Sequence, residues 1–362
     1  MKSRVAAAFI ATLFLAAAAV GQKLEKPKLI PTPATESQQQ LIKEGIELHD
    51  KGDFDGAISR YEKVLKENPN NVLALYEMSF SYYAKKDYQK SIDTGYRAAQ
   101  FKSDLLDAIY VQIGTCFDDQ GDAKKAVEVY KAGLKLSPSS SLLEYNLAVT
   151  YLHTGKLEDA RAAVKRAAMF NPNHPSSQLL LSTLFDKGSY KIPSLLAAWR
   201  FLILEPGSPR SEAVLELVSK LMQGGVAPGK DANTINLVFD TTQKKDEGDF
   251  QSIELFIGLM RAANLTEKNK DKSETQLLLD NFNSLFTVLS EQTNKADRSK
   301  FTWKFYVPYF VAMKQQGHTE AFTYYVNQRG TTAGVNVWLR QHQNKVHAFL
   351  DWSRNYQWPK PD

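Results

Sequence analysis

One short segment recurs along the first half of the chain at a spacing of about 34 residues. Each copy contains a polar turn, then a small residue and an apolar residue, and the copies lie at 52–58, 86–92, 121–127 and 155–161. A proline that cannot continue a helix closes three of these units. The prolines are Pro69, Pro138 and Pro172. A unit this short cannot bury its own apolar face, so the repeat predicts a row of units stacked on one another.

Apolar residues follow one another at steps of three and four on both sides of each turn, which is the period of an amphipathic helix. In the first unit this pattern covers 41–48 before the turn and 57–65 after it. Asn68 and Pro69 then end the second helix. Each unit is therefore predicted to be a pair of helices joined by a tight turn.

The residue types within each pair carry a resemblance to a known family. Gly45 lies in the first helix of the first unit, Ala57 and Tyr61 lie in the second helix, and Pro69 closes the unit. This arrangement resembles the tetratricopeptide repeat family. The matching residues of the next three units are Tyr82, Ala98, Gly114, Phe117, Ala126, Tyr130, Pro138, Leu147, Ala148, Tyr151, Ala160, Ala167 and Pro172. A fifth unit at 175–206 matches less well.

The resemblance implies an α-α superhelix of about five helix pairs over 37–210, with paired helices in close contact. The small residues that leave room for the partner helix are Gly45, Ser79, Gly114 and Ala148. A larger side chain at any of these positions is expected to force the two helices apart, at a cost of about 1–3 kcal/mol. In the fifth unit, Ser194 and Ala198 stand where a small and an aromatic residue are expected.

The repeat pattern stops after Pro206. An amphipathic helix at 211–222 and a glycine-containing turn form a predicted connection at 211–230. The remaining residues, 231–362, are predicted to form a C-terminal helical domain. Its candidate helices lie at 232–244, 249–264, 273–291, 300–316, 319–327 and 334–356. The predicted fold class of the whole chain is all-α.

The N-terminus carries a predicted targeting signal. A short basic start precedes an apolar run from Val5 to Val20, and small residues follow. This order is typical of a secretory signal peptide, here 1–21, with cleavage predicted after Gly21. An uncleaved membrane anchor is the alternative, although the run is shorter than the ~20 residues that a span needs. The proline-rich stretch 22–36 is predicted to be a flexible linker, and a periplasmic or secreted protein is expected.

Composition narrows the classes of partner and chemistry. The 362 residues carry a formal net charge of +5, too small an excess to predict nucleic-acid binding. Cys116 is the single cysteine, so no disulfide can form within the chain, and its apolar helical neighbours predict burial. The six histidines are scattered, and the common motifs of hydrolases, metalloproteases and phosphate-binding loops are missing. We expect no cofactor, no metal ion and no catalysis.

The resemblance also implies a binding surface, because arrays of this family have a concave groove lined by the first helices. The polar and aromatic residues that we predict to bind a partner there are Tyr76, Phe80, Tyr83, Asp118, Asp119, Tyr145 and His153. Rigid aromatic side chains bury much area with little loss of entropy, which suits an extended peptide or a partner's helix. The alternative is that some of these aromatic residues pack between repeats.

The C-terminal half contains a second group of aromatic residues. They are Phe301, Trp303, Phe305, Tyr306, Tyr309, Phe310, Trp338, Phe349, Trp352, Tyr356 and Trp358. We expect them to form the core of the C-terminal domain. If exposed, they could stack on the sugar rings of cell-wall glycan, and a deep polar pocket beside Trp303 and Trp338 would favour that role.

The sequence therefore predicts an exported, non-catalytic scaffold that binds a protein or peptide partner in the bacterial envelope. Two alternatives stay open. The C-terminal domain could bind or act on glycan, with the repeats as its docking module, or the stacked repeats could associate with a second copy of the chain.

Overall fold

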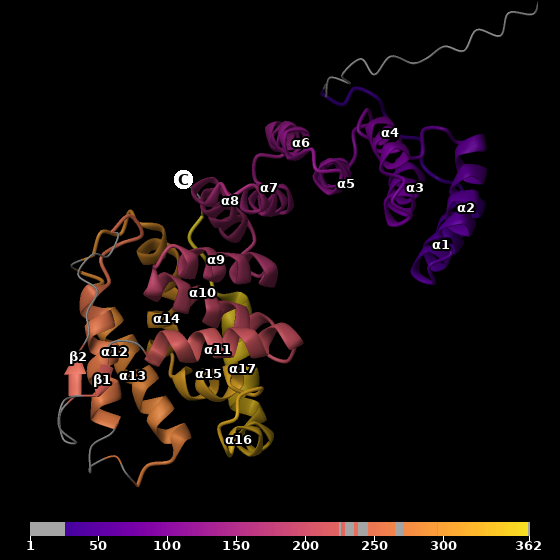
Figure 1. Cartoon of the computed structure of the whole chain (residues 1–362). Helices are drawn as coiled ribbons and strands as arrows, with labels where there is room; N and C mark the ends of the chain where they lie inside the picture. The colour runs from indigo at the N-terminus through magenta and orange to yellow at the C-terminus, as the bar shows by residue number, and fades with distance from the viewer. Residues whose placement is uncertain are drawn as a thin grey trace, which may run out of the picture. The chain divides into compact units, whose positions relative to one another are not determined.

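The computed structural model describes residues 26–223, 226–228, 235–237, 245–264, 269, 271–294 and 296–360. These residues contain seventeen α-helices and two short strands (Figure 1). The predicted signal peptide, 1–21, falls outside the described residues. Within the described ranges, no helix is both long enough and apolar enough to cross a membrane.

The chain divides into two compact units, Met1–Cys116 and Phe117–Asp362, which we call unit 1 and unit 2. In unit 1, the first helix packs on the second, the second on the third and the third on the fourth. The helices of unit 1 are α1 (Glu36–Asp50), α2 (Phe54–Glu67), α3 (Val72–Ala84), α4 (Tyr88–Ala98) and the greater part of α5 (Leu106–Asp119). The domain boundaries predicted from the sequence stay predictions.

Unit 2 contains further helix pairs and then the C-terminal helices. The first six of these helices pack in chain order, each on its neighbour. These helices are α6 (Ala123–Leu136), α7 (Ser141–His153), α8 (Leu157–Phe170), α9 (Pro175–Lys187), α10 (Lys191–Leu204) and α11 (Pro209–Gln223). The C-terminal helices are α12 (Gln251–Asn264), α13 (Glu274–Gln292), α14 (Phe301–Gln315), α15 (Thr319–Val326), α16 (Val335–Gln341) and α17 (Gln343–Asn355). The predicted all-α fold class with serial helix pairs is confirmed.

The prediction of a helix at 232–244 is wrong for residues 235–237. Strand β2 (Ile235–Leu237) lies there and pairs antiparallel with β1 (Val226–Pro228). Apolar and polar residues alternate along β2, which is the period of a strand and not of a helix. The rest of this candidate helix falls outside the described residues. The candidate helix at 334–356 is interrupted at His342, which separates α16 from α17.

The turn within a helix pair has one recurring backbone conformation. Gly52, Gly121 and Gly155 have φ angles of +83°, +82° and +73°, a left-handed conformation that glycine adopts without strain. The residue that follows Gly52 caps α2, because the Asp53 carboxylate accepts a backbone N–H at 2.9 Å. In the second helix pair, which also belongs to unit 1, Lys86 adopts the same conformation, with φ of +63°. Local sequence thus sets the turn, which is why the repeat is visible in the sequence.

Small residues let the paired helices approach closely, as predicted for Gly45. A Cβ atom on Gly45 would lie 2.4 Å from Cε1 of Tyr61, so the tyrosine ring fills the space that the glycine leaves. In the second helix pair, Ser79 and Ser91 take the small positions. Their hydroxyl groups donate to each other's backbone carbonyl oxygens at 2.9 and 2.8 Å. In the fifth helix pair, Ser182 and Ser194 form the same two hydrogen bonds with each other's carbonyl oxygens. These bonds satisfy hydroxyl groups that are buried between helices.

Part of the predicted linker is bound to unit 1 and is not free. The backbone N–H of Leu29 donates to the Gln100 carbonyl oxygen at 3.1 Å, and the N–H of Lys102 donates to the Leu29 carbonyl oxygen at 2.9 Å. The side-chain amide of Asn68 donates to the Thr32 carbonyl oxygen at 3.2 Å. Three prolines in a polar stretch indicate an extended chain, and here the extended chain finds backbone partners.

Helix α10 lies at the centre of unit 2. Its residues from Ile192 to Ile203 are all buried, because α14 and α15 pack on it in addition to α9 and α11. Trp199 is surrounded by four phenylalanine rings at centroid distances of 4.9 to 5.9 Å. The guanidinium group of Arg200, also buried, donates to the hydroxyl groups of Tyr309 at 3.2 Å and Ser353 at 2.9 Å. The fifth helix pair therefore belongs to the core of the C-terminal helices as well.

Candidate partner-binding site

Five rings in contact with one another form a continuous row in unit 1. The ring of His49 stacks on Phe80 with centroids 4.8 Å apart, and Phe80 stacks on Tyr83 at 6.4 Å. Phe54 meets His49 edge-on at 5.1 Å, and Tyr88 lies 5.9 Å from Tyr83. We call these five residues the aromatic row. Phe80 is 38% exposed, so the row is open to solvent at its centre.

The repeat itself places these rings together. His49 and Tyr83 occupy the last turns of α1 and α3, the first helices of consecutive pairs. Phe54 and Tyr88 are the first residues of α2 and α4. Stacking of one pair on the next brings equivalent positions side by side, which lines the rings up. The His49 ring is fixed further, because its Nδ1 lies 2.8 Å from the Ser81 hydroxyl oxygen.

Two carboxylates lie close to the aromatic row. Glu77 is on α3, three residues before Phe80, and Asp50 is the last residue of α1, directly after His49. Burial and, to a lesser extent, the negative charge of Asp50 raise the pKa of Glu77. Among the described residues neither carboxylate forms an ion pair with a lysine or arginine. The two groups leave negative charge without a described ion-pair partner near the exposed ring of Phe80.

The predicted groove residues of unit 1 are only partly brought together. Phe80 and Tyr83 stack on each other in the aromatic row. Tyr76 lies on the same helix but outside the row; it is half-buried, and burial together with the charge of Glu77 raises its pKa.

The other predicted groove residues lie in unit 2. Asp118 and His153 come together, with the carboxylate Oδ2 3.4 Å from Nδ1 of the imidazole. Tyr145 meets the ring of His174 edge-on at 4.9 Å. Asp119 is exposed to solvent. The role of all the predicted groove residues in binding a partner stays a prediction.

The helix pairs that carry these residues match the model of a known protein family. The family model described as Tetratricopeptide repeat matches residues 48–94 and 119–184. The chain carries tetratricopeptide repeats. The first matched stretch includes every residue of the aromatic row, so the row is built by two consecutive tetratricopeptide repeats.

Curated relatives match this chain over only part of their own length. The chain is 25% identical over 135 residues to BBSome complex member BBS4 of Bos taurus and 29% identical over 140 residues to cellulose synthase operon protein C of Pseudomonas fluorescens (strain SBW25). Each match covers 37% of this chain but only 26% and 11% of the respective relatives. Among solved structures, TTC0263, a thermophilic TPR protein in Thermus thermophilus, is 19% identical with a TM-score of 0.40, covering 51% of this chain and 96% of that one.

The sequence analysis predicted two of the five residues of the aromatic row, Phe80 and Tyr83. The tetratricopeptide repeat spacing could have indicated Phe54 and Tyr88, because they lie 34 residues apart at equivalent positions. No sequence signal joined Asp50 to Glu77, since their proximity depends on the packing of α1 against α3.

Beyond the tetratricopeptide repeats, the C-terminal aromatic residues mostly form the core, as expected. The buried ones are Trp303, Phe305, Tyr306, Tyr309, Phe310 and Phe349. Trp338 is half-buried and stacks between Tyr324 at 4.1 Å and His342 at 4.3 Å.

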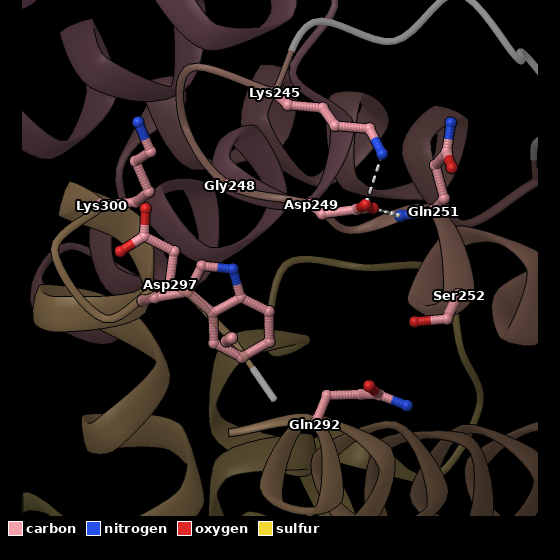
Figure 2. Close-up of a pocket in the computed structure, with 10 residues that line it drawn as sticks. Lys245, Gly248, Asp249, Gln251, Ser252, Gln292, Asp297 and Lys300 are labelled. Carbon is pink, nitrogen blue, oxygen red and sulfur yellow. Dashed lines mark hydrogen bonds and ion pairs between the residues drawn. The ribbon is translucent and has the colours of Figure 1, made fainter. Parts of the chain in front are cut away.

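A polar cavity of about 570 Å³ lies beside Trp303 in unit 2 (Figure 2). Its walls come from the segment before α12 and the start of that helix, from the end of α13 and from the start of α14. The polar residues that line it are Lys245, Asp249, Gln251, Ser252, Gln292, Asp297 and Lys300. Trp338 is not among the lining residues. In the ranges that the structure describes, no cluster of three His, Cys, Asp or Glu side chains could hold a metal ion.

Proposed function

We propose that this chain is a non-catalytic scaffold of the bacterial envelope that binds a protein partner through the aromatic row. The partner segment that fits the row carries Lys or Arg side chains. The observation that supports this choice is the carboxylate pair of Asp50 and Glu77, which has no described ion-pair partner and lies near the exposed ring of Phe80. A cation over an aromatic face gains about 0.5–1 kcal/mol when exposed and ~2 kcal/mol when desolvated. The carboxylates add attraction of the same sign and favour basic over acidic partners.

The proposed location depends on the signal-like sequence at 1–21. The proposed scaffolding role depends on the repeat architecture, because stacked helix pairs present an extended surface to partners. Because the proposed location is the envelope, the envelope fraction of the native host is the source from which a partner is sought.

Affinity enrichment from that fraction, with the full chain as bait, tests the proposal. The partner should be retained by the wild-type chain, lost from the Phe80→Ala/Tyr83→Ala variant and released by high salt, which screens exposed charges. Tyr324→Ala is the matched control, because Tyr324 is a half-buried aromatic residue of unit 2 that stacks on a neighbouring ring. Equal retention by the double variant would exclude the row as the site. A retained partner that contacts the row through an acidic segment would exclude the proposed chemistry.

Replacing Glu77 by glutamine is expected to weaken partner binding while stabilising the fold. Burial and Asp50 raise the pKa of Glu77, so the folded state binds this proton more tightly than the unfolded state does. Folding is therefore opposed by the carboxylate at neutral pH, and the opposition disappears as the pH falls through the raised pKa. Thermal unfolding should show Glu77→Gln melting higher at pH 7, by on the order of 2 °C, and level with the wild type at about pH 4. A lower melting temperature at pH 7 would contradict this account of Glu77.

A further inference from the structure

The charged side chains that line the polar cavity of unit 2 balance one another. The ammonium group of Lys245 donates to Asp249 Oδ2 at 2.6 Å, and Asp249 Oδ1 accepts a backbone N–H of α12 at 3.1 Å. The carboxylate of Asp297 accepts the hydroxyl and the backbone N–H of Ser299 at 2.6 and 3.0 Å. With Lys300, the lining holds two ammonium groups and two carboxylates. The charged side chains that the structure describes in this lining therefore sum to no net charge.

The uncharged side chains of the lining supply donors and acceptors. Figure 2 shows Ser252 on one side, Gln292 below and Asp249 above the same open space. Within the described part of the chain, neither the Ser252 hydroxyl nor the Gln292 amide is bonded to another side chain. A hydroxyl group and an amide can each donate and accept, whereas an ionised carboxylate only accepts. A ligand that complements these side chains needs several uncharged groups that each donate and accept hydrogen bonds.

An aromatic side chain forms one wall of the cavity. Trp303 is only 2% exposed and stacks on Phe250 with ring centroids 4.7 Å apart. Its indole Nε1 is buried and has no hydrogen-bond partner among the described residues. Gly248 passes close to this ring, because a Cβ atom there would lie 2.5 Å from Cδ1 of the indole. Its φ of +115° also favours glycine at this position.

Buried ion pairs hold the segment that supplies this glycine. Glu247 is 2% exposed and pairs with Lys165 and with Arg161, whose Nε lies 3.2 Å from the carboxylate. Asp246 pairs with Arg161 at 2.9 Å and accepts the hydroxyl of Tyr190 at 2.6 Å. A lining that is fixed before a ligand arrives loses little conformational entropy on binding. These pairs therefore hold the Gly248 side of the cavity in place before a ligand arrives.

We infer that this cavity binds a neutral saccharide. Ring hydroxyl groups donate and accept together, so they match carboxylate, amide and hydroxyl side chains at once. A neutral ligand also leaves no charge unpaired in a lining that is already balanced. The volume of about 570 Å³ lies within the range of roughly 300–1,000 Å³ that is usual for small-molecule sites. This inference is independent of the aromatic row and gives unit 2 a ligand of its own.

Calorimetric titration of the full chain with N,N′,N″-triacetylchitotriose and with maltotriose, both neutral, tests the inference. Glycine, a zwitterion, and inorganic phosphate, an anion, are the charged comparisons. At least one trisaccharide should bind, and Gln292→Ala should weaken that binding about tenfold, the loss expected for one or two neutral hydrogen bonds. Ser252→Trp should abolish binding by filling the cavity, since Ser252 is an exposed position where a large side chain does not disturb the core. Gln343→Ala, an exposed glutamine on α17, is the matched control and should bind like the wild type.

The indole N–H resonance of Trp303, assigned with Trp303→Phe, should shift on saccharide binding and stay unchanged in Ser252→Trp. Heat from glycine or phosphate alone would overturn the choice of ligand. Saccharide binding that survives Ser252→Trp would overturn the choice of cavity. The absence of binding heat from all four compounds would overturn the choice of ligand and the choice of cavity. None of these outcomes depends on whether a protein partner occupies the aromatic row.

Discussion

Alanine in place of Trp199 is expected to lower the free energy of unfolding of unit 2 by about 4 kcal/mol. Trp199 is fully buried on α10, and its ring contacts phenylalanines from α13, α14 and α15. Removing it leaves a large cavity at the point where the fifth helix pair meets the C-terminal helices. The surrounding rings are rigid and can close only part of that space.

Urea unfolding followed by tryptophan fluorescence measures this loss. All five tryptophans lie in unit 2, so the four that remain report on this unit alone. Trp338→Ala is the control, because Trp338 is half-buried and stacks near the surface, and its loss should be about 1–2 kcal/mol. Equal losses for the two variants would show that α10 is not the centre of the core.

The second large effect is expected for Glu247→Ala, at about 3–5 kcal/mol. The Glu247 carboxylate is 2% exposed and neutralises Lys165 and Arg161, whose side chains are 20% and 7% exposed. Burial lowers the pKa of Lys165, while the charge of Glu247 opposes that shift. Without Glu247, both cations would stay in the interior with less compensation, which costs far more than a surface pair contributes.

Asp249→Ala is the matched control for Glu247→Ala in the same urea measurement. Asp249 lies two residues further along and pairs with Lys245, but both side chains are more than half exposed. Such a pair contributes about 0–1 kcal/mol. A loss below about 1 kcal/mol for Glu247→Ala would mean that the segment before α12 is not held by buried charge.

The repeated part of the fold could be predicted from the sequence because its determinants are local. Gly52 and Asp53 set a turn and a cap within a few residues, and Gly45 makes room for a ring of the same helix pair. The centre of unit 2 could not be predicted in this way. Arg200 contacts Ser353, a residue 153 positions away, and no local pattern encodes that contact.

The candidate site, like the fold, could be predicted from the sequence only where its determinants are local. Phe80 and Tyr83 lie on one helical face, so periodicity indicated them together. Asp50 and Glu77 lie on different helices, and their mutual repulsion appears only when α1 packs against α3. The polar cavity depends on Gly248 meeting Trp303, which brings together residues from separate parts of the C-terminal half.

A photo-reactive phenylalanine analogue in place of Phe80 tests the central claim most directly. Irradiation in the native host, followed by mass spectrometry, identifies the protein and the segment that contact the aromatic row. The account predicts adducts with one envelope protein, at a segment that carries Lys or Arg side chains, and no such adducts when the analogue replaces Tyr324. Adducts that are equally frequent from both positions, or that map to an acidic segment, would contradict it.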